Sequence, residues 1–378
     1  MTVRPDGTMD LTDVRRHHLS LVLQRLRREG PRSRAALAQE TGLTKATVSA
    51  LITELLRRDL VTELETTKDG RVGRPGTDVA ATGRGIGGLG LQIEVDHVAA
   101  SIIDLTGAVR AEASHRADNR TAGPKRLIER LRKVAGTALA IADAEGIRCV
   151  GGTLAVPGLV DPRSGTLFVA PNLHWFNADL AALTERLGLP ESIPLTFENE
   201  ANLGALAEQR VGVGQDVSSF VYVSGGWGIG AGIILDGRLI RGGHGFAGEL
   251  GHVMVDALGR PCACGGIGCL ETVAGLDAEA DDAAVADALA IALRDVVHLV
   301  DPEAIVLGGS FAEHGERFAA TVREQLIAST LGARWSPVDV RPSRLGHDAA
   351  IVGAATVALD RILDDPSLVP AVPATRTA

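Results

Sequence analysis

The sequence GFAGELGHVMVDALGRPCACGGIGCLE, residues 245–271, decides how the whole chain is interpreted. Nine, one and four residues lie between the successive members of a possible metal-ligand set: His252, Cys262, Cys264 and Cys269. One histidine and three cysteines at this spacing can close around a single tetrahedral Zn²⁺. Because the protein would supply all four ligands, the metal would have no open position and would be structural. The alternative is a group of buried free thiols.

The cysteine count and the apolar runs bear on the compartment in which the protein works. Four cysteines, three of them within eight positions, fit a metal site in a reducing compartment better than a disulfide framework. Cys149, alone in an apolar strand, is expected in the core. The sequence has no stretch of 18 apolar residues and no N-terminal signal pattern. We therefore expect a cytoplasmic protein with no membrane partner.

Charge is unevenly distributed along the chain. Residues 1–80 hold 14 Lys and Arg against 11 Asp and Glu, a net charge of +3, whereas the remainder holds 24 against 36, a net charge of −12. A basic head on an acidic body suits a head that faces a polyanion such as DNA.

The head has the helix pattern of a DNA reader. Apolar residues recur at helical spacing through residues 11–28, Ser33 can cap a helix over 34–40, and a third helix is expected over about 44–58. Gly42 lies in the turn between the last two helices, which form a helix-turn-helix whose second helix can lie in the major groove. The side chains expected to contact DNA are short hydrogen-bond formers and cations: Ser33, Arg34, Thr44, Lys45, Thr47 and Ser49.

A basic, glycine-rich stretch follows at residues 68–76. Asp69-Gly70 is a hairpin signal, and the flanking Arg71 and Arg74 would suit a wing whose tip enters the minor groove. A solvated loop between two domains is the alternative, but the position directly after a helix-turn-helix favours the wing. Residues 11–80 are thus expected to form a winged helix-turn-helix DNA-binding domain.

The body begins with a strand pattern that occurs twice. Residues 88–107 and 219–237 each contain a strand, a glycine-bearing or polar loop, a second strand, and a turn at Thr-Gly or Asp-Gly. Helical patterns at 125–144 and 201–210 are interleaved with these units. The repetition predicts a duplicated α/β architecture with a cleft between two lobes.

Five motifs together resemble the ROK family, and the last two are highly specific for it. They are AVPGLVD at 155–161, PNLHW at 171–175, ENEANL at 198–203, GFAGELGH at 245–252 and CACGGIGCLE at 262–271. The ROK family groups bacterial repressors with sugar kinases on the actin-like ATPase fold, which is ribonuclease-H-like. The resemblance covers about residues 85–360 and implies a sugar-binding domain of two lobes over 85–365. The head resembles the repressor branch, because the kinases of the family lack a winged helix.

The resemblance also implies which side chains contact a sugar. In ROK proteins these come from the ENEAN-type motif, from the Gly-Glu-x-Gly-His motif and from the position after the last cysteine, which here gives Asn199, Glu200, Glu249, His252 and Glu271. Carboxylates are strong acceptors for sugar hydroxyls, and Glu198 would add one more. Any one of these glutamates alone would more simply be a solvated surface group, but the set within family motifs favours sugar binding.

Three departures from the kinases of the family argue against phosphoryl transfer, which needs a phosphate cradle, Mg²⁺ ligation and a base. The loop that is Asp-x-Gly-Gly-Thr in ROK kinases is here QIEVD at 92–96, so that Glu94 and Val95 replace glycines, and Glu94 and Asp96 would repel a triphosphate. Glu200 stands where the kinases have an aspartate base, and Trp227 adds bulk to the second phosphate loop. A sugar kinase with an accessory DNA-binding head is the alternative.

We therefore expect a non-catalytic, sugar-responsive transcriptional repressor that binds operator DNA as a homodimer or higher oligomer. The ENEAN motif resembles that of xylose-responsive members of the family, so xylose is the first candidate effector, followed by glucose and N-acetylglucosamine. The residues leave open an activator, or a repressor that needs its sugar as corepressor. Residues 278–292 are expected to form a solvated helix, and the tail from Val369 is expected to be disordered.

Overall fold

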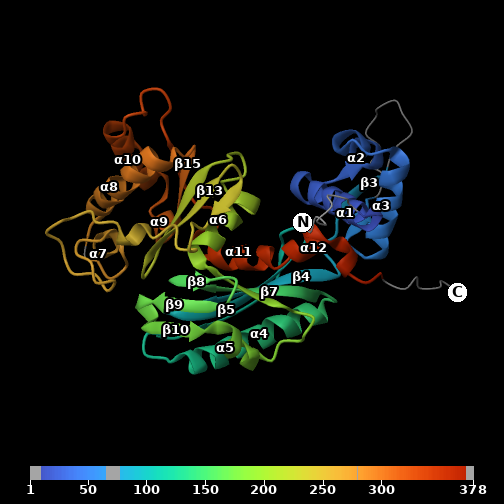
Figure 1. Ribbon diagram of the computed structural model, residues 1–378, viewed down its shortest axis with the longest axis horizontal. Helices are drawn as coiled ribbons and strands as arrows, with labels where there is room; N and C mark the ends of the chain where they lie inside the picture. The colour runs from blue at the N-terminus through green and yellow to red at the C-terminus, as the bar shows by residue number, and fades with distance from the viewer. Residues whose placement is uncertain (1–9, 65–76, 279, 372–378) are drawn as a thin grey trace.

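The computed structural model describes residues 10–64, 77–278 and 280–371. A helical head precedes a body of two α/β lobes, which confirms the predicted fold class. In Figure 1 the head lies beside helix α12, and helix α11 runs between the two lobes.

The head packs its helices around one core, with a small sheet beside them. Its elements are α1 (Leu11–Glu29), β1 (Arg32–Ser33), α2 (Arg34–Thr41), α3 (Lys45–Arg57), β2 (Val61–Glu63) and β3 (Asp78–Ala81), and the strands pair in the order β1-β3-β2. Ser33 and Thr44 cap α2 and α3, because each side-chain oxygen accepts a backbone N–H three residues ahead. Arg71 and Arg74 of the expected wing lie outside the described residues.

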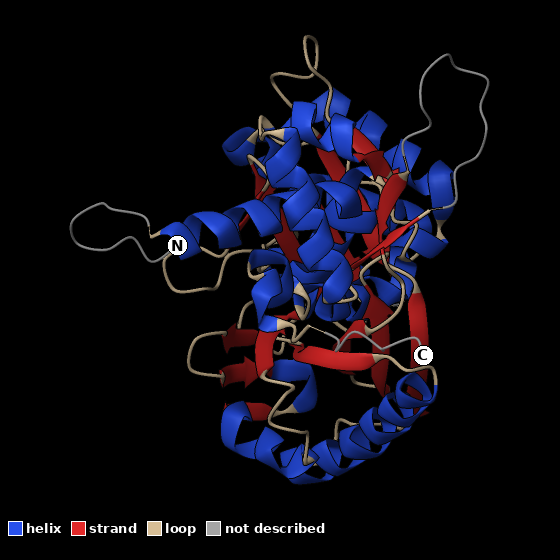
Figure 2. Ribbon diagram, turned by 90° about the vertical axis from the view of Figure 1, so that its right-hand side faces the viewer, coloured by secondary structure: helices blue, strands red, loops and turns tan. Residues whose placement is uncertain are grey.

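The first lobe is built on a sheet with the strand order β11-β7-β4-β5-β6. Helix α4 covers its outer face (Figures 1 and 2), and a smaller sheet, β10-β9-β8, stands beside it. The elements are β4 (Ile86–Ile93), β5 (His97–Asp104), β6 (Val109–Arg116), α4 (Pro124–Ala144), β7 (Arg148–Val156), β8 (Leu159–Asp161), β9 (Thr166–Ala170), β10 (Trp175–Asp179), α5 (Leu180–Thr184) and β11 (Leu195–Asn199). Cys149 is buried in β7, as expected of a core residue.

The second lobe repeats this plan in the order β14-β13-β12-β15-β16. In both lobes, the first three strands form an antiparallel meander, and the two later strands run parallel to the first strand of that meander. The predicted duplication is therefore confirmed. The elements are β12 (Phe220–Gly225), β13 (Ile229–Leu235), β14 (Arg238–Ile240), α7 (Leu270–Ala274), α8 (Asp282–Val300), β15 (Ala304–Gly309), α9 (Ser310–Glu313), α10 (Gly315–Ser329) and β16 (Asp339–Pro342).

The prediction of a solvated helix at 278–292 is wrong. Helix α8 buries Val285, Leu289 and Leu293 in the core of the second lobe, together with residues of α10. The alanines of the segment are part of the reason, because Ala286, Ala288 and Ala292 have small side chains that let neighbouring elements approach closely.

Helices α6 (Glu200–Val211) and α11 (Ala349–Val357) pack against each other between the two sheets. The contact of α11 with β4 is close, since a Cβ on Gly90 would stand 2.4 Å from the carbonyl oxygen of Ile351. Only glycine fits this position of β4. Helix α11 is therefore held firmly to the first lobe at one side and to α6 at the other.

The end of the described chain is part of the head's core. Helix α12 (Asp360–Asp364) and the short 3₁₀ helix Pro366–Leu368 pack on α1, and Val369 is only 1% exposed. Arg58, just after α3, donates to the carbonyl oxygens of Ser367 and Val369. The prediction of disorder from Val369 onward is wrong for residues 369–371, and residues 372–378 lie outside the described part. The segment looked like a tail because its partners lie some 300 residues earlier in the sequence.

Candidate functional site

Five polar side chains from separate parts of the sequence meet at one cavity of about 570 Å³ between β8, β9, α6, β13 and the 248–271 region. They are the residues expected to contact a sugar: Asn199, Glu200, Glu249, His252 and Glu271. A cavity of this size holds a small organic ligand. Asn172 and His174, from the PNLHW motif, also line the cavity, although they were not among the predicted sugar contacts.

The start of helix α6 positions two of these residues. Asn199 caps the helix through Oδ1, which accepts from the backbone N–H groups of Ala201 and Asn202 at 2.8 and 3.2 Å. Its Nδ2 donates to the carbonyl oxygen of Gly158 at 3.0 Å, so one N–H remains to point at a ligand. Glu200 is the first residue of the helix, and its side chain lines the cavity.

Glu198 does not serve the cavity as expected. Its carboxylate accepts from Arg241 Nε at 2.8 Å and from Asn202 Nδ2 at 3.0 Å. Glu198 is 5% exposed and comes from a strand of the first lobe, whereas Arg241 follows β14 of the second. The residue therefore forms an ion pair between the lobes and is not an additional sugar acceptor.

The His252, Cys262, Cys264 and Cys269 ligand atoms all lie within 4.8 Å of one another. Cys264 Sγ is 3.7 Å from Cys269 Sγ, and Cys262 Sγ is 3.7 Å from His252 Nδ1. A tetrahedral metal with bonds of about 2.3 Å to sulfur sets neighbouring sulfur atoms about 3.8 Å apart. The spacing and the donor types fit such a metal, and the cluster could hold one.

The metal cluster and the cavity share His252. Its Nδ1 faces Cys262, while its Nε2 lies 4.0 Å from Glu249 Oε2 on the cavity side. A ligating histidine whose second nitrogen faces a carboxylate has a fixed tautomer and ring orientation. Gly268, with φ +62°, lets the loop close, since a Cβ there would stand 1.5 Å from the carbonyl oxygen of Asp256. A bound metal would thus hold one wall of the cavity in place.

The carboxyl groups of the cavity are poorly solvated. Burial raises the pKa of Glu249, and the nearby His252 partly offsets this. Burial likewise raises the pKa of Glu271, whose Oε2 accepts from the backbone N–H of Ile229 at 3.1 Å. For Glu200, burial and then the neighbouring Glu94 carboxyl raise the pKa well above its ordinary value. Groups that hold their protons can donate hydrogen bonds to hydroxyl oxygens as well as accept them.

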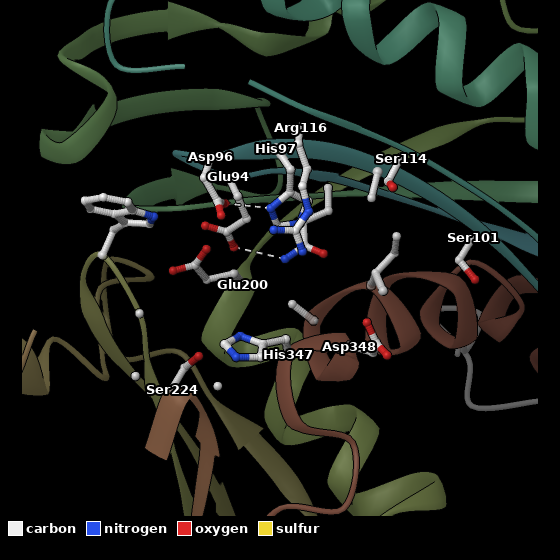
Figure 3. A pocket seen from close by; sticks show the side chains of 18 of the residues that line it. Glu94, Asp96, His97, Ser101, Ser114, Arg116, Glu200, Ser224, His347 and Asp348 are labelled. Carbon is white, nitrogen blue, oxygen red and sulfur yellow. Dashed lines mark hydrogen bonds and ion pairs between the residues drawn. The ribbon is translucent and has the colours of Figure 1, made fainter. Parts of the chain in front are cut away.

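A second cavity of about 650 Å³ adjoins the first, and both are lined by Glu94, Glu200, Trp227 and Gly228. Figure 3 shows Glu94, Asp96 and Glu200 gathered at one end of this second cavity. Val95, which replaces the second glycine of the kinase loop, packs in the core of the first lobe and lines only the first cavity, whereas Glu94 lines both cavities. Trp227 carries the Arg120 guanidinium over its ring at 4.9 Å.

The candidate DNA-contacting residues lie at the starts of α2 and α3. Lys45 and Ser49 are exposed and Thr47 is half-buried. Three others already have partners: Ser33 and Thr44 act as caps, and Arg34 pairs with Glu63 at 2.5 Å. Lys45 and Ser49 are therefore the side chains best placed to reach outward from α3.

Comparison with known families agrees with this geometry. The model of the ROK family matches residues 88–283 and 277–361, and that of the MarR family matches residues 12–72. The chain belongs to the ROK family. Within the described residues of this ROK protein, no helix is both long and apolar enough to cross a bilayer.

Relatives from both branches of the ROK family are similar to this chain. The xylose repressor of Bacillus spizizenii is 27% identical over 94% of this chain and 98% of its own length. The glucokinase of Thermotoga maritima is 31% identical, over 61% of this chain and 86% of its own. A ROK family transcriptional regulator described as a homologue of the E. coli MLC protein has the same fold, with a TM-score of 0.75, 24% identity, and coverage of 93% of this chain and 97% of its own.

Glu200→Gln is expected to raise the melting temperature at pH 8 and to change it little at pH 5. The folded protein raises the pKa of Glu200 above the ordinary 4.5, so ionisation favours the unfolded chain as the pH rises past that value. Glutamine cannot ionise and avoids this cost. In a domain of about 150–250 residues each kcal/mol is worth about 2–4 °C, and calorimetry at the two pH values resolves such a shift.

The exposed loop residue Glu191 offers the matched control, because Glu191→Gln removes the same charge outside both cavities. An equal gain at pH 5 and pH 8 would show that Glu200 ionises normally in the folded protein.

Proposed function

We propose that this ROK protein is a sugar-responsive transcriptional repressor, with a winged-helix DNA-binding domain over residues 11–80 and a non-catalytic sugar-binding domain over 85–365. One observation carries the proposal: one chain has both a helix-turn-helix head and a cavity lined by five side chains that can hydrogen-bond with hydroxyl groups. A glutamate also enters the cleft beside that cavity. The similarity to xylose repressors along nearly their whole length supports it.

The effector is a monosaccharide held by Asn199, Glu200, Glu249, His252 and Glu271. Several fixed acceptors and donors facing one small space suit a ligand with many hydroxyl groups. Xylose is the first candidate, because the relatives named xylose repressors align over 94% of this chain. Glucose and N-acetylglucosamine follow, since ROK relatives named for those sugars are also similar.

The His252, Cys262, Cys264 and Cys269 cluster holds a structural Zn²⁺. The donor set of one nitrogen and three sulfurs, its compactness and its closed coordination favour zinc over harder cations, which prefer oxygen. The ion would tie the loop that carries Cys262 and Cys264 to His252 and Cys269 in the cavity wall. Glu271, two residues after Cys269, would be held in place with that wall.

The head binds operator DNA through the start of α3, with Lys45, Thr47 and Ser49 toward the groove and Ser33, Arg34 and Thr44 near the backbone. Arg71 and Arg74, which the sequence predicts to contact DNA, lie outside the described residues and stay a prediction. A homodimer would present two such heads to a two-fold operator. One head alone makes a single groove contact and would bind the operator weakly.

Sugar kinase activity is the second candidate function, because a ROK glucokinase is 31% identical over 61% of this chain and another has the same fold, with a TM-score of 0.64. Glu94 argues against it. Its carboxyl lies at the junction where the sugar cavity meets the second cavity, so it would repel an incoming phosphate and crowd the group to be transferred. A coupled ADP-release assay with MgATP and a sugar panel decides between the two, and turnover near one per second would establish a kinase.

A continuous path connects the sugar cavity to the head. Helix α6 begins at Glu200 in the cavity and runs 12 residues, about 18 Å, to its far end, where Arg210 donates to Asp360 of α12 at 2.8 Å. Arg27 of α1 lies beside this pair, and its burial lowers the pKa of Arg27 to about 10. A shift of α6 on sugar binding would therefore reach the head through α12.

Arg210→Gln is expected to weaken the response to sugar without weakening either ligand's own binding. The substitution breaks the Arg210–Asp360 link while leaving the cavity and the start of α3 intact. The factor by which sugar changes DNA affinity should fall at least threefold, measured by fluorescence anisotropy with and without saturating sugar. Arg238→Gln, at an exposed position after β13, is the matched control. An undiminished response in Arg210→Gln would place the coupling elsewhere.

The proposal as a whole is tested by a gel shift. A duplex selected by the protein from a randomised library is titrated with protein and then with D-xylose, D-glucose and N-acetyl-D-glucosamine. We expect a specific complex that at least one sugar releases. Absence of any specific complex, with or without sugar, would refute the proposed function.

A further inference from the structure

Glu94 was expected only to repel phosphate, yet it lines the sugar cavity as well as the second cavity. It lies in the turn between β4 and β5, after a strand that α11 holds firmly, and it faces Glu200 at the start of α6. In Figure 3 the two carboxyl groups point toward each other, and they lie within hydrogen-bonding reach. The pair stands where the two cavities join.

Two carboxyl groups can share a hydrogen bond only when one of them carries a proton. Gln92, a buried residue of β4, donates to Glu94 Oε1 at 2.9 Å, so this oxygen already acts as an acceptor. Glu200 Oε2 is buried and has no hydrogen-bond partner among the described residues. The geometry therefore places the proton on Glu200, as its raised pKa also indicates.

Among the described residues, the charged neighbours that shift the pKa of Glu200 are all carboxyl groups. Glu249 and Glu271 add negative potential from the sugar cavity, and Tyr222 of β12 lies behind Glu200. The titratable groups that face the pair across the second cavity are Asp96, His97, Glu112, Arg116, Glu313, His347 and Asp348. Several of these are already paired, as in His97 with Asp96 at 2.7 Å and His347 with Glu313 at 2.7 Å.

We propose that Glu94 is a further effector-contact residue and that, with Glu200, it forms an acid–carboxylate pair whose remaining carboxyl oxygens accept hydrogen bonds from the hydroxyl groups of the bound sugar. This inference rests on the proposed function, because it concerns the same cavity. The pair selects neutral, hydroxyl-bearing sugars and rejects sugar phosphates, whose charge would meet the carboxyl groups of Glu94, Glu249 and Glu271. When rising pH removes the shared proton, the two carboxylates repel each other and the paired geometry is lost, so sugar binding weakens.

The test is calorimetric titration of the full chain with D-xylose, D-glucose, N-acetyl-D-glucosamine and D-glucose 6-phosphate from pH 6 to pH 9. For the sugar bound most tightly, Glu94→Ala should lower the affinity at pH 7 at least tenfold. Glu94→Gln should keep the affinity within about threefold, because its amide replaces the shared hydrogen bond. It should also remove the loss of affinity that the unsubstituted protein shows as the pH is raised. Glucose 6-phosphate should bind at least tenfold more weakly than glucose.

Asp96→Ala is the matched control, since it removes an acid two residues away that lines only the second cavity. It should leave affinity and pH profile unchanged. Equal affinities for Glu94→Ala and Asp96→Ala, or the same pH profile for Glu94→Gln and the unsubstituted protein, would overturn the inference while leaving the proposed function standing. No binding of any of the sugars by the unsubstituted protein would overturn both.

Discussion

Cys269→Ser is expected to empty the metal site and to lower sugar affinity by at least a hundredfold. Cys269 is 3% exposed, its Sγ lies 3.7 Å from that of Cys264, and the next two residues begin α7 and carry Glu271 into the cavity. Structural Zn²⁺ contributes about 10–16 kcal/mol to folding in zinc-finger peptides, far more than a short loop can recover by other contacts. Without the metal, the segment from Val253 to Cys269 would lose its closed form and release both Glu271 and His252.

Metal content by mass spectrometry, melting temperature and sugar titration together measure this effect. Cys149→Ser is the matched control, because Cys149 is also a buried cysteine but lies in β7 of the first lobe, outside the cluster. It should keep one zinc per chain and near-normal sugar affinity. A full complement of zinc in Cys269→Ser, or unchanged sugar binding by zinc-free protein, would contradict the structural role of the metal.

Lys45→Glu is expected to reduce operator affinity by at least a hundredfold and to leave sugar affinity unchanged. Lys45 is the first residue of α3 and is exposed. Reversing its charge replaces an attraction to phosphate with a repulsion, and a dimer would suffer this at both half-sites. The loss should diminish as salt is raised, because the lost contact is electrostatic.

The opposite end of the same helix supplies the control. Arg57 is exposed in the last turn of α3, so Arg57→Glu makes the same charge reversal away from the start of the helix. Anisotropy titrations at two salt concentrations compare the two variants. Equal losses would mean that overall charge, and not the start of α3, determines DNA binding.

Local features of the head and of the metal loop could be predicted because neighbours in sequence create them. The caps at Ser33 and Thr44 follow from short-range geometry. The compact His252, Cys262, Cys264 and Cys269 set follows from ligand spacing within an 18-residue stretch. The duplicated hairpins were visible for the same reason, since each forms within about 20 residues.

Features that depend on distant partners could not be predicted. Glu198 was counted as a sugar acceptor because the sequence does not show that Arg241 approaches it. Val369 and α8 were misjudged because their apolar contacts come from the head and from α10. The sequence shows that Glu94 replaces a glycine of the kinase phosphate loop. Its pairing with Glu200 could not be predicted, because the turn and the helix that carry the two residues are about 100 residues apart.

The most direct test of sugar-responsive DNA binding is thermodynamic reciprocity. Sugar affinity is measured by calorimetry for the free protein and for its complex with the selected duplex, and DNA affinity is measured with and without saturating sugar. If one equilibrium links the cavity to the head, both measurements must give the same factor, which for coupled sites is about 5–150-fold. We expect equal factors within that range. A DNA affinity that sugar does not change, while the sugar itself binds, would contradict the account.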